Sequence, residues 1–325
     1  MKMKKILSAV MALTLAAATC VSLSGCGKKS AKYTVGICQL VQHDALDAAT
    51  KGFKDVLKEK LGDDIEFDEQ NAANDSATCA TIANQFVSNK VDLIMANATP
   101  ALQAAAAATA DIPVVATSIT DYATALEISD WTGKTGKNIT GSSDLAPLKE
   151  QAEMIKELFP EAKKVGILYN SGEANSKYQA TEVTKALKEL GIEAKEYTSA
   201  DSNDLASVVT TACAEVDVIY IPTDNTMASN TGIVNNIAEP AKVPVVAGEV
   251  GICKGCGVAT LSIDYYSIGK KAGEMAYEIL VNGAKPGDME IEYADELTKQ
   301  YMASRCKTLG ITVPDTYEAI AEDAE

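Results

Sequence analysis

The sequence predicts an α/β protein built as two doubly wound parallel-sheet lobes, and three observations support this fold class. Short apolar runs alternate with segments of helical periodicity, which is typical of strand–helix–strand units. The alternation fills two successive stretches of about 110 residues, each the size of an ordinary domain. The two stretches also repeat one plan, because VDLIMANATPALQAAAAAT and DIPVVATSITD match VDVIYIPTDNTMASNTGIVNNIA and KVPVVAGEV in order and pattern. Right-handed crossovers then place helices on both faces of each sheet.

The strands are expected where short, mostly apolar runs are bounded by turn residues, as in buried parallel strands. These runs cover residues 33–38, 64–67, 91–96, 113–117, 165–169, 192–197, 216–221 and 243–247. The helices between them are expected from apolar stripes at helical spacing, such as Ala49, Phe53 and Leu57. The expected helices cover residues 44–61, 75–89, 100–109, 147–158, 176–190, 203–214, 227–238 and 267–282.

The N-terminus has the pattern of a bacterial lipoprotein signal. Three lysines precede an apolar run over residues 6–21, and small residues stand directly before Cys26. The run is shorter than the roughly 20 apolar residues of a membrane span, so a transmembrane anchor or buried helix is the weaker alternative. We expect residues 1–25 to be a cleaved signal peptide and Cys26 to carry a lipid at the start of a tether over residues 26–32. The protein is then anchored to the cell membrane on its extracytoplasmic face.

Charge and missing motifs exclude several functions. The 325-residue chain has a formal net charge of −16, and nucleic acid is not an expected partner because phosphate contacts need a basic surface. The sequence has no GxSxG, Walker, HExxH or GxGxxG motif in a suitable place. His43 is the only histidine, so a metal site of nitrogen ligands is excluded. We therefore expect no enzyme, no cofactor and no metal.

The cysteines after Cys26 fall into two groups. Four lie on strand-like or helix-like segments and are expected to be small buried residues: Cys38, Cys79, Cys213 and Cys306. Cys253 and Cys256 form a CxxC pair that we expect in a loop, because Gly251, Gly255 and Gly257 disfavour a helix. A zinc site would need two further ligands nearby, and a redox motif should open a helix. A loop disulfide or two free thiols remain, and a thiol redox protein is the alternative from another functional class.

Ligands of open parallel sheets bind beyond the carboxyl ends of the strands, so two facing lobes form a cleft. The polar residues near these ends are the candidate ligand-binding residues: Gln39, His43, Thr99, Ser118, Thr120, Asp121, Asn175, Ser176, Asp224, Asn225, Glu249 and Asp264. An amino-acid ligand needs donors at its carboxylate and acceptors at its ammonium group. We expect the loop before the helix at 176–190, with Asn175 and Ser176, to bind the carboxylate, unless these residues only cap that helix.

The other candidates have similar alternatives. Ser118, Thr120 and Asp121 give one strand end more polar side chains than a turn needs. Asp224 is the leading acceptor for the ammonium group, and its alternative role is an N-cap. Thr99 is expected to cap the helix that has Pro100 at its first position, and it can also bind ligand. Four aromatic residues are either stacking partners or core: Tyr122, Trp131, Tyr265 and Tyr266.

Several stretches in the right order resemble the substrate-binding lipoproteins of ABC importers in the tryptophan and aromatic amino-acid group. They are GICQLVQHDALDAATKGFKD, NAAND, DLIMANATPALQA, IPVVATSITD, KNITGSSDL, KKVGILYNSGEANS, VDVIYIPTDNT and SIDYYSIGKKAGEMAYEIL. The resemblance implies a type I periplasmic-binding-protein fold whose lobes are joined by three crossing segments. Lobe 1 is expected at residues 33–143 plus 264–288, and lobe 2 at 144–263 plus 289–325. Tyr122 departs from the pattern, which has proline there, as does the cysteine-bearing segment 250–257.

The function implied by the resemblance is that of a solute-binding protein that captures a free amino acid, aromatic or large and apolar, by cleft closure. It then passes the ligand to an ABC permease with a cytoplasmic ATPase, and we expect a monomer. The alternative within the binding class is the same fold holding a sugar, a nucleoside or another small solute. Sugar sites commonly use planar charged side chains, whereas the single arginine, Arg305, is far from the expected cleft.

Overall fold

The computed structural model describes residues 31–322. The chain divides into two units, residues 1–32 and 33–325, and every described helix and strand belongs to the second. The expected signal peptide, Cys26 and most of the tether lie outside the described residues. Within the described range, every helix is too short or too polar to cross a membrane.

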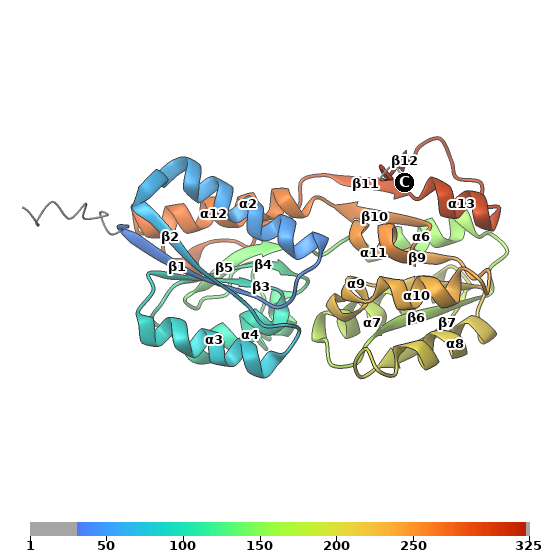
Figure 1. Ribbon diagram of the computed structural model, residues 1–325, viewed down its shortest axis with the longest axis horizontal. Helices are drawn as coiled ribbons and strands as arrows, with labels where there is room; N and C mark the ends of the chain where they lie inside the picture. The colour runs from blue at the N-terminus through green and yellow to red at the C-terminus, as the bar shows by residue number, and fades with distance from the viewer. Residues whose placement is uncertain (1–30, 323–325) are drawn as a thin grey trace, which may run out of the picture. The chain divides into compact units, whose positions relative to one another are not determined.

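The first lobe is built on a parallel five-stranded sheet with the order β2-β1-β3-β4-β5 (Figure 1). Its strands are β1 (Tyr33–Gln39), β2 (Ile65–Asn71), β3 (Leu93–Asn97), β4 (Val114–Ile119) and β5 (Ile139–Ser143). Its helices are α2 (Asp44–Leu61), η1 (Gly62–Asp64), α3 (Ser76–Asn89), α4 (Thr99–Ala108), α5 (Tyr122–Ala125) and α12 (Tyr265–Asn282). We call this part lobe 1.

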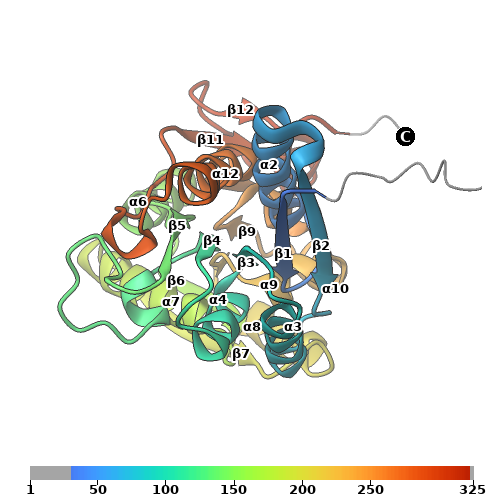
Figure 2. The same cartoon turned by 90° about the vertical axis from the view of Figure 1, so that its left-hand side faces the viewer.

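Helices cover both faces of the lobe 1 sheet, as Figure 2 shows. On one face α2 and α12 lie side by side and bury Phe53 and Met275 against the strands. Their backbones are very close, because a Cβ on Gly52 would lie 2.2 Å from the carbonyl oxygen of Tyr266. On the other face α3 and α4 bury Phe86 and Leu102.

The second lobe is built on a seven-stranded sheet with the order β12-β11-β10-β9-β8-β6-β7. Its strands are β6 (Lys164–Asn170), β7 (Glu193–Ser199), β8 (Val218–Ile221), β9 (Val245–Ala247), β10 (Ala259–Ile263), β11 (Leu297–Tyr301) and β12 (Glu318–Ala319). Its helices are α6 (Leu148–Leu158), α7 (Ala174–Glu189), α8 (Leu205–Glu215), α9 (Asn225–Ser229), α10 (Thr231–Ala238), α11 (Val250–Cys256) and α13 (Ala303–Leu309). We call this part lobe 2. Helices α6 and α7 pack on one core, and α8 and α10 on another.

The chain passes between the lobes three times (Figure 1). It leaves lobe 1 between β5 and α6, returns at Asp264 between β10 and α12, and leaves again after the short helix η2 (Pro286–Asp288) to enter β11. β11, which was not predicted, runs antiparallel to β10 in a sheet that was predicted to be parallel. β10 ends at the second crossing and β11 begins after the third, and the two ends lie side by side because Ile263 pairs with Leu297. β11 therefore runs back along β10. The predicted fold class, two α/β lobes on largely parallel sheets, is confirmed.

Some predicted elements differ from the structure. The expected helix at 227–238 is interrupted at Asn230 and becomes α9 and α10. The segment 250–257 is not a loop, because residues 250–256 form helix α11. Its Gly255 allows a close approach to α10, since a Cβ there would lie 2.1 Å from the Thr231 hydroxyl oxygen. The prediction missed α5, α13, β5, β10, β11 and β12.

Candidate ligand-binding site

A small cavity lies between the two lobes at the carboxyl ends of the strands. Its lining residues come from both lobes: His43, Leu46, Ser118, Thr120, Asp144, Asn175, Thr223, Asp224, Asn225, Ala228, Glu249 and Tyr265. The cavity volume is about 10 Å³, which is room for roughly one water molecule. The lobes are therefore closed on each other, and a larger molecule reaches the cavity only if they move apart.

The sheet topology explains why these residues meet. Thr120 and Asp144 follow β4 and β5, while Thr223 and Glu249 follow β8 and β9. Parallel strands bring their carboxyl ends to one edge of each sheet, and the two edges face each other across the cavity. A second hollow, of about 460 Å³, shares His43 and Ala228 with the cavity and opens outward beside α11.

Three side-chain atoms in the cavity wall are buried without a hydrogen-bond partner. They are His43 Nδ1, Ser118 Oγ and Asn175 Oδ1, out of eight such atoms in the described residues. Buried polar atoms are normally paired, and an unpaired one costs about 1–3 kcal/mol. Ser118 also has a φ of 57°, in the left-handed region that non-glycine residues rarely adopt and that is common at binding sites. These features indicate a site built to bind a polar molecule.

Three buried carboxyl groups make the cavity acidic. Asp144 accepts hydrogen bonds from the Thr120 and Tyr265 hydroxyls, each at 3.0 Å, and burial raises its pKa to about 6. Asp224 accepts from the backbone N–H groups of Asn170 at 2.7 Å and Met227 at 2.8 Å. Burial, and then the nearby charge of Glu173, raise the pKa of Asp224 to about 8.

Glu249 is the third acid. It accepts from the backbone N–H groups of Gly251 and Ile252 at the start of α11, and burial raises its pKa. None of the twelve lining residues is a lysine or an arginine. Since opposite charge favours the ionised carboxyl group, the cavity suits a molecule that brings a positive charge.

Glu173, just behind the cavity, organises the lobe 2 wall. Its carboxylate accepts from the backbone N–H groups of Asn225 at 3.0 Å and Thr226 at 2.9 Å. It also accepts from the side chains of Asn225, Thr226 and Asn175. One buried acid therefore fixes the start of α9 against α7. Glu173 is not among the residues predicted from the sequence.

Three contacts join the lobes around the cavity. His43 Nε2 lies 3.2 Å from Asn225 Oδ1, and the Asn74 amide donates to the Thr226 hydroxyl at 3.0 Å. At the exposed edge, Lys254 Nζ lies 3.9 Å from a carboxylate oxygen of Asp44. All three link lobe 1 to α9 or α11 of lobe 2.

Seven of the twelve candidate residues line the cavity: His43, Ser118, Thr120, Asn175, Asp224, Asn225 and Glu249. Asp224 also caps α9, which is the alternative role predicted for it, and Glu249 caps α11. The two N–H groups of the Asn175 amide are shared among three nearby oxygens, so its free atom is an acceptor.

Five candidates lie elsewhere. Gln39 is buried inside lobe 1, where it donates to Asp47 and accepts from Thr50. Asp121 caps α5, and the exposed Asp264 caps α12. Ser176 is buried behind the wall.

The prediction that Thr99 caps α4 is wrong. Thr99 is the first residue of that helix, and the N-cap position is taken by Ala98, at a φ of 86°.

Four lining residues were not predicted from the sequence as ligand-binding residues: Leu46, Asp144, Thr223 and Ala228. Asp144 directly follows β5, and recognising that strand would have marked it as a candidate. Of the aromatic candidates only Tyr265 lines the cavity. Tyr122 is core, where its hydroxyl donates to two backbone carbonyls, Trp131 packs on the lobe 1 core, and the Tyr266 hydroxyl donates to Asp55.

The Cys253–Cys256 pair consists of two free, buried thiols. Burial raises the pKa of both, that of Cys256 to about 12. Reactive cysteines have a lowered pKa and are partly exposed, so this pair does not have the properties of a redox centre. In residues 31–322 no three histidine, cysteine or acidic residues are grouped so that they could hold a metal ion.

Comparison with known proteins identifies the family. The model of the ABC transporter substrate binding protein family matches residues 34–324. The chain is 38% identical over 312 residues to the tyrosine-binding protein of Clostridioides difficile, which covers 91% of this chain and 89% of that protein.

Two solved structures are informative. One, from Streptococcus pneumoniae in complex with L-Trp, has 34% identity and a TM-score of 0.85, covering 89% of this chain and 99% of that one. The other, a ligand-free, open substrate binding protein from Clostridium difficile, has 36% identity and the same coverage but a TM-score of 0.68. The lower TM-score against the open structure agrees with the closed cavity. This chain belongs to the family of ABC transporter substrate-binding proteins.

Proposed function

We propose that this protein is the solute receptor of an ABC importer and captures a free aromatic amino acid by closing its lobes over it. The observation that carries the proposal is the convergence of unpaired polar atoms and buried acids from both lobes in one closed cavity. A ligand that contacts both lobes stabilises the closed state, because only there does it make all its contacts. The role is binding and not catalysis.

The positions of donors and acceptors suggest how the ligand head group is bound. We propose that the ammonium group lies between Asp144 of the lobe 1 edge and Asp224 of lobe 2, with Asn175 Oδ1 as a further acceptor. Ser118 Oγ is a free donor for the carboxylate, whereas the Thr120 hydroxyl is already used by Asp144. This reverses the role that we expected for Asn175.

An aromatic side chain is favoured by the relatives. One is a tyrosine-binding protein and another was solved with L-Trp. Leu46 and Ala228 give the cavity apolar walls from opposite lobes. Either ligand needs more room than the cavity of this structure has, so we propose that the lobes open to admit the ligand and then close over it less tightly than they do here.

A ligand screen tests this function. Purified protein is heated with each of the twenty L-amino acids, with several sugars and with nucleosides. We expect L-tyrosine, L-tryptophan or L-phenylalanine to raise the melting temperature, since a ligand at about 100 times its Kd adds roughly 2.7 kcal/mol of stability. A shift with a sugar or nucleoside and with no amino acid would contradict the proposal. Mass spectrometry of co-purified small molecules gives an independent answer.

We also propose that the protein is tethered through a lipid on Cys26 to the extracytoplasmic face of the membrane, beside an ABC permease and its ATPase. The lipoprotein signal in the sequence and the family support this placement. Cys26→Ser is expected to give a soluble protein or an uncleaved precursor in cell fractionation. Finding an unlipidated mature N-terminus in the wild type would exclude the anchor.

A further inference from the structure

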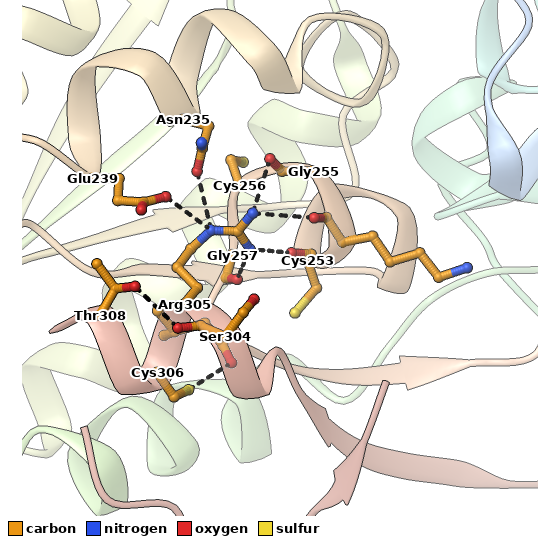
Figure 3. Close-up of polar contacts among 12 residues, drawn as sticks. Asn235, Glu239, Cys253, Gly255, Cys256, Gly257, Ser304, Arg305, Cys306 and Thr308 are labelled. Atoms are coloured by element: carbon orange, nitrogen blue, oxygen red, sulfur yellow. Dashed lines mark hydrogen bonds and ion pairs between the residues drawn. The ribbon is translucent and has the colours of Figure 1, made fainter. Parts of the chain in front are cut away.

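Arg305, the only arginine of the chain, binds the C-terminal end of α11 (Figure 3). Nη1 donates to the carbonyl oxygens of Cys253, at 3.0 Å, and Gly257. Nη2 donates to those of Lys254 and Gly255, both at 3.2 Å. One guanidinium group therefore satisfies four carbonyl groups around the end of a short helix, those of residues 253–255 and 257.

The guanidinium group is itself fixed from α10. Its Nε donates to Asn235 Oδ1 at 3.0 Å and lies 3.6 Å from a carboxylate oxygen of Glu239. The arginine side chain is only 11% exposed. Figure 3 shows these partners arranged around the guanidinium plane, so that α13, α10 and α11 meet at this one side chain.

Helix α11 depends on such support. It has seven residues, two of them glycines, and a helix of this composition and length is unstable alone. The last carbonyls of a helix lack partners within it, and a positive charge at that end also interacts favourably with the helix dipole. Arg305 supplies both the donors and the charge.

The other end of α11 faces the ligand cavity. Glu249 caps that end and lines the cavity. Lys254, on the same helix, lies opposite Asp44 of lobe 1. Arg305 is not among the residues that line the cavity, so any effect on ligand binding must pass through α11.

We infer that Arg305 is a positioning residue for ligand capture, which holds α11 so that Glu249 keeps its place in the cavity wall. The inference relies on the proposed function for the identity of the ligand. Lysine cannot replace this arginine, because its single ammonium group is a point charge and cannot span four carbonyls and an amide. Arg305→Lys therefore separates the geometry of the contact from its charge.

A first experiment measures whether Arg305 holds α11. Cys253 and Cys256 are buried in α11, and Cys38 and Cys79 are buried in lobe 1, so native thiols report on both regions. Folded wild type and Arg305→Lys are treated with iodoacetamide, and the labelled peptides are quantified by mass spectrometry. We expect faster labelling of Cys253 and Cys256, by about tenfold or more, with Cys38 and Cys79 unchanged. Equal labelling of the α11 thiols in both proteins would overturn the inference.

A second experiment measures affinity for L-tyrosine by calorimetry, well below the melting temperature of each variant. We expect Arg305→Lys to raise the Kd about tenfold. The matched control is Lys299→Gln, which removes an ion pair with Glu157 from the same C-terminal segment and should leave the Kd unchanged. A lower melting temperature with unchanged Kd for Arg305→Lys is the result of a purely structural role and would overturn the inference.

A mutant cycle tests the route through Glu249. In a Glu249→Gln background, Arg305→Lys should have little further effect on the Kd. Additive effects of the two substitutions on the Kd would overturn the inference that Arg305 acts on ligand binding through Glu249. If Arg305→Lys does not fold, Asn235→Ala removes one partner of the guanidinium group and replaces it in both experiments. Wild-type protein that binds no aromatic amino acid would contradict the proposed function, and thiol labelling would then decide alone whether Arg305 holds α11.

Discussion

The two lobes contribute polar side chains to the same cavity but hold them differently. In lobe 2, Asp224 accepts one backbone N–H at the end of β6 and one at the start of α9. Glu249 accepts two at the start of α11, and Glu173, behind them, accepts two at the start of α9. On the lobe 1 side, the side-chain donors to Asp144 are the hydroxyls of Thr120 and Tyr265, and Ser118 Oγ has no partner.

This difference indicates a division of labour. Lobe 2 has a wall that is fixed by its own backbone, so it can bind part of a ligand before closure. Lobe 1 supplies two of the three unpaired polar atoms of the cavity, His43 Nδ1 and Ser118 Oγ, against one from lobe 2, Asn175 Oδ1, and a ligand can satisfy them when the lobes close. An acid that caps a helix, such as Asp224, can therefore also bind the ligand, since one carboxylate oxygen can accept two hydrogen bonds.

The largest effect is expected for Glu173→Gln, which tests the fixed wall of lobe 2. Both carboxylate oxygens face N–H or O–H donors, so an amide NH₂ group at either position opposes a donor. Hydrogen bonds to a charged group contribute about 1.5–3 kcal/mol each, and we expect a loss of about 3 kcal/mol or more in the free energy of unfolding. Urea unfolding measures it.

The matched control for Glu173 is Glu182→Gln on α7, the helix that directly follows Glu173. Glu182 makes an exposed ion pair with Lys185 three residues later, and such pairs contribute roughly 0–1 kcal/mol. Equal stability of the two variants would show that the lobe 2 wall does not depend on Glu173.

The next effect compares the two acids that we place around the ligand ammonium group. Asp144→Asn and Asp224→Asn should each weaken L-tyrosine binding more than tenfold, since removing one partner of a buried charge pair costs about 2–5 kcal/mol. Only Asp224→Asn should also destabilise the ligand-free protein, by about 1 kcal/mol, because it alters a helix cap. Calorimetry and urea unfolding on both variants separate affinity from stability.

Asp264→Asn is the control for these two acids. It alters the cap of α12 on an exposed residue outside the cavity, so affinity should not change. Unchanged affinity for Asp224→Asn would remove Asp224 from the ligand site, and equal destabilisation by both cavity variants would contradict the difference between the lobes.

Sequence reasoning succeeded where a signal was local. Helix α2 begins and ends at the predicted residues, because its apolar stripe, Asp44 and Gly62 are all in one segment. It failed for α11, whose stability depends on Arg305 about fifty residues later in the chain. It also missed β5, a small-residue strand in which Gly141 lies so close to the neighbouring strand that a Cβ would be 1.9 Å from the Ala116 carbonyl oxygen. Because that strand was not predicted, Asp144 at its carboxyl end was not recognised as a candidate.

The acids also predict a pH dependence. The folded protein raises the pKa of Asp144 to about 6 and that of Asp224 to about 8, from an ordinary value of 3.8. Between about pH 4 and 8 the folded ligand-free protein thus binds more protons than the unfolded chain, and the stability from these groups falls as pH rises. An ammonium group favours the ionised acids, so L-tyrosine affinity should increase from pH 5 to 8, with protons released on binding.

Calorimetry in buffers of different ionisation enthalpy measures that proton release. Asp144→Asn should remove the change near pH 6, and Asp224→Asn the change near pH 8. Affinity that stays constant from pH 5 to 8 would mean that neither acid contacts a charged ligand group.

The smallest effect is expected at the exposed edge of the cleft, for Lys254→Gln. Lys254 and Asp44 are 47% and 72% exposed, and their charged atoms are 3.9 Å apart. Exposed pairs contribute about 0.2–1 kcal/mol and are screened by salt, so the Kd for L-tyrosine should rise at most about fivefold at low salt and not at all in high salt. Calorimetry at two salt concentrations, with Asp44→Asn and the double variant, isolates the pair. The contrary result would be that Lys254→Gln weakens binding as much as Asp144→Asn does, with no influence of salt. That result would mean that the exposed edge controls closure and that Asp144 and Asp224 are not the main determinants of affinity.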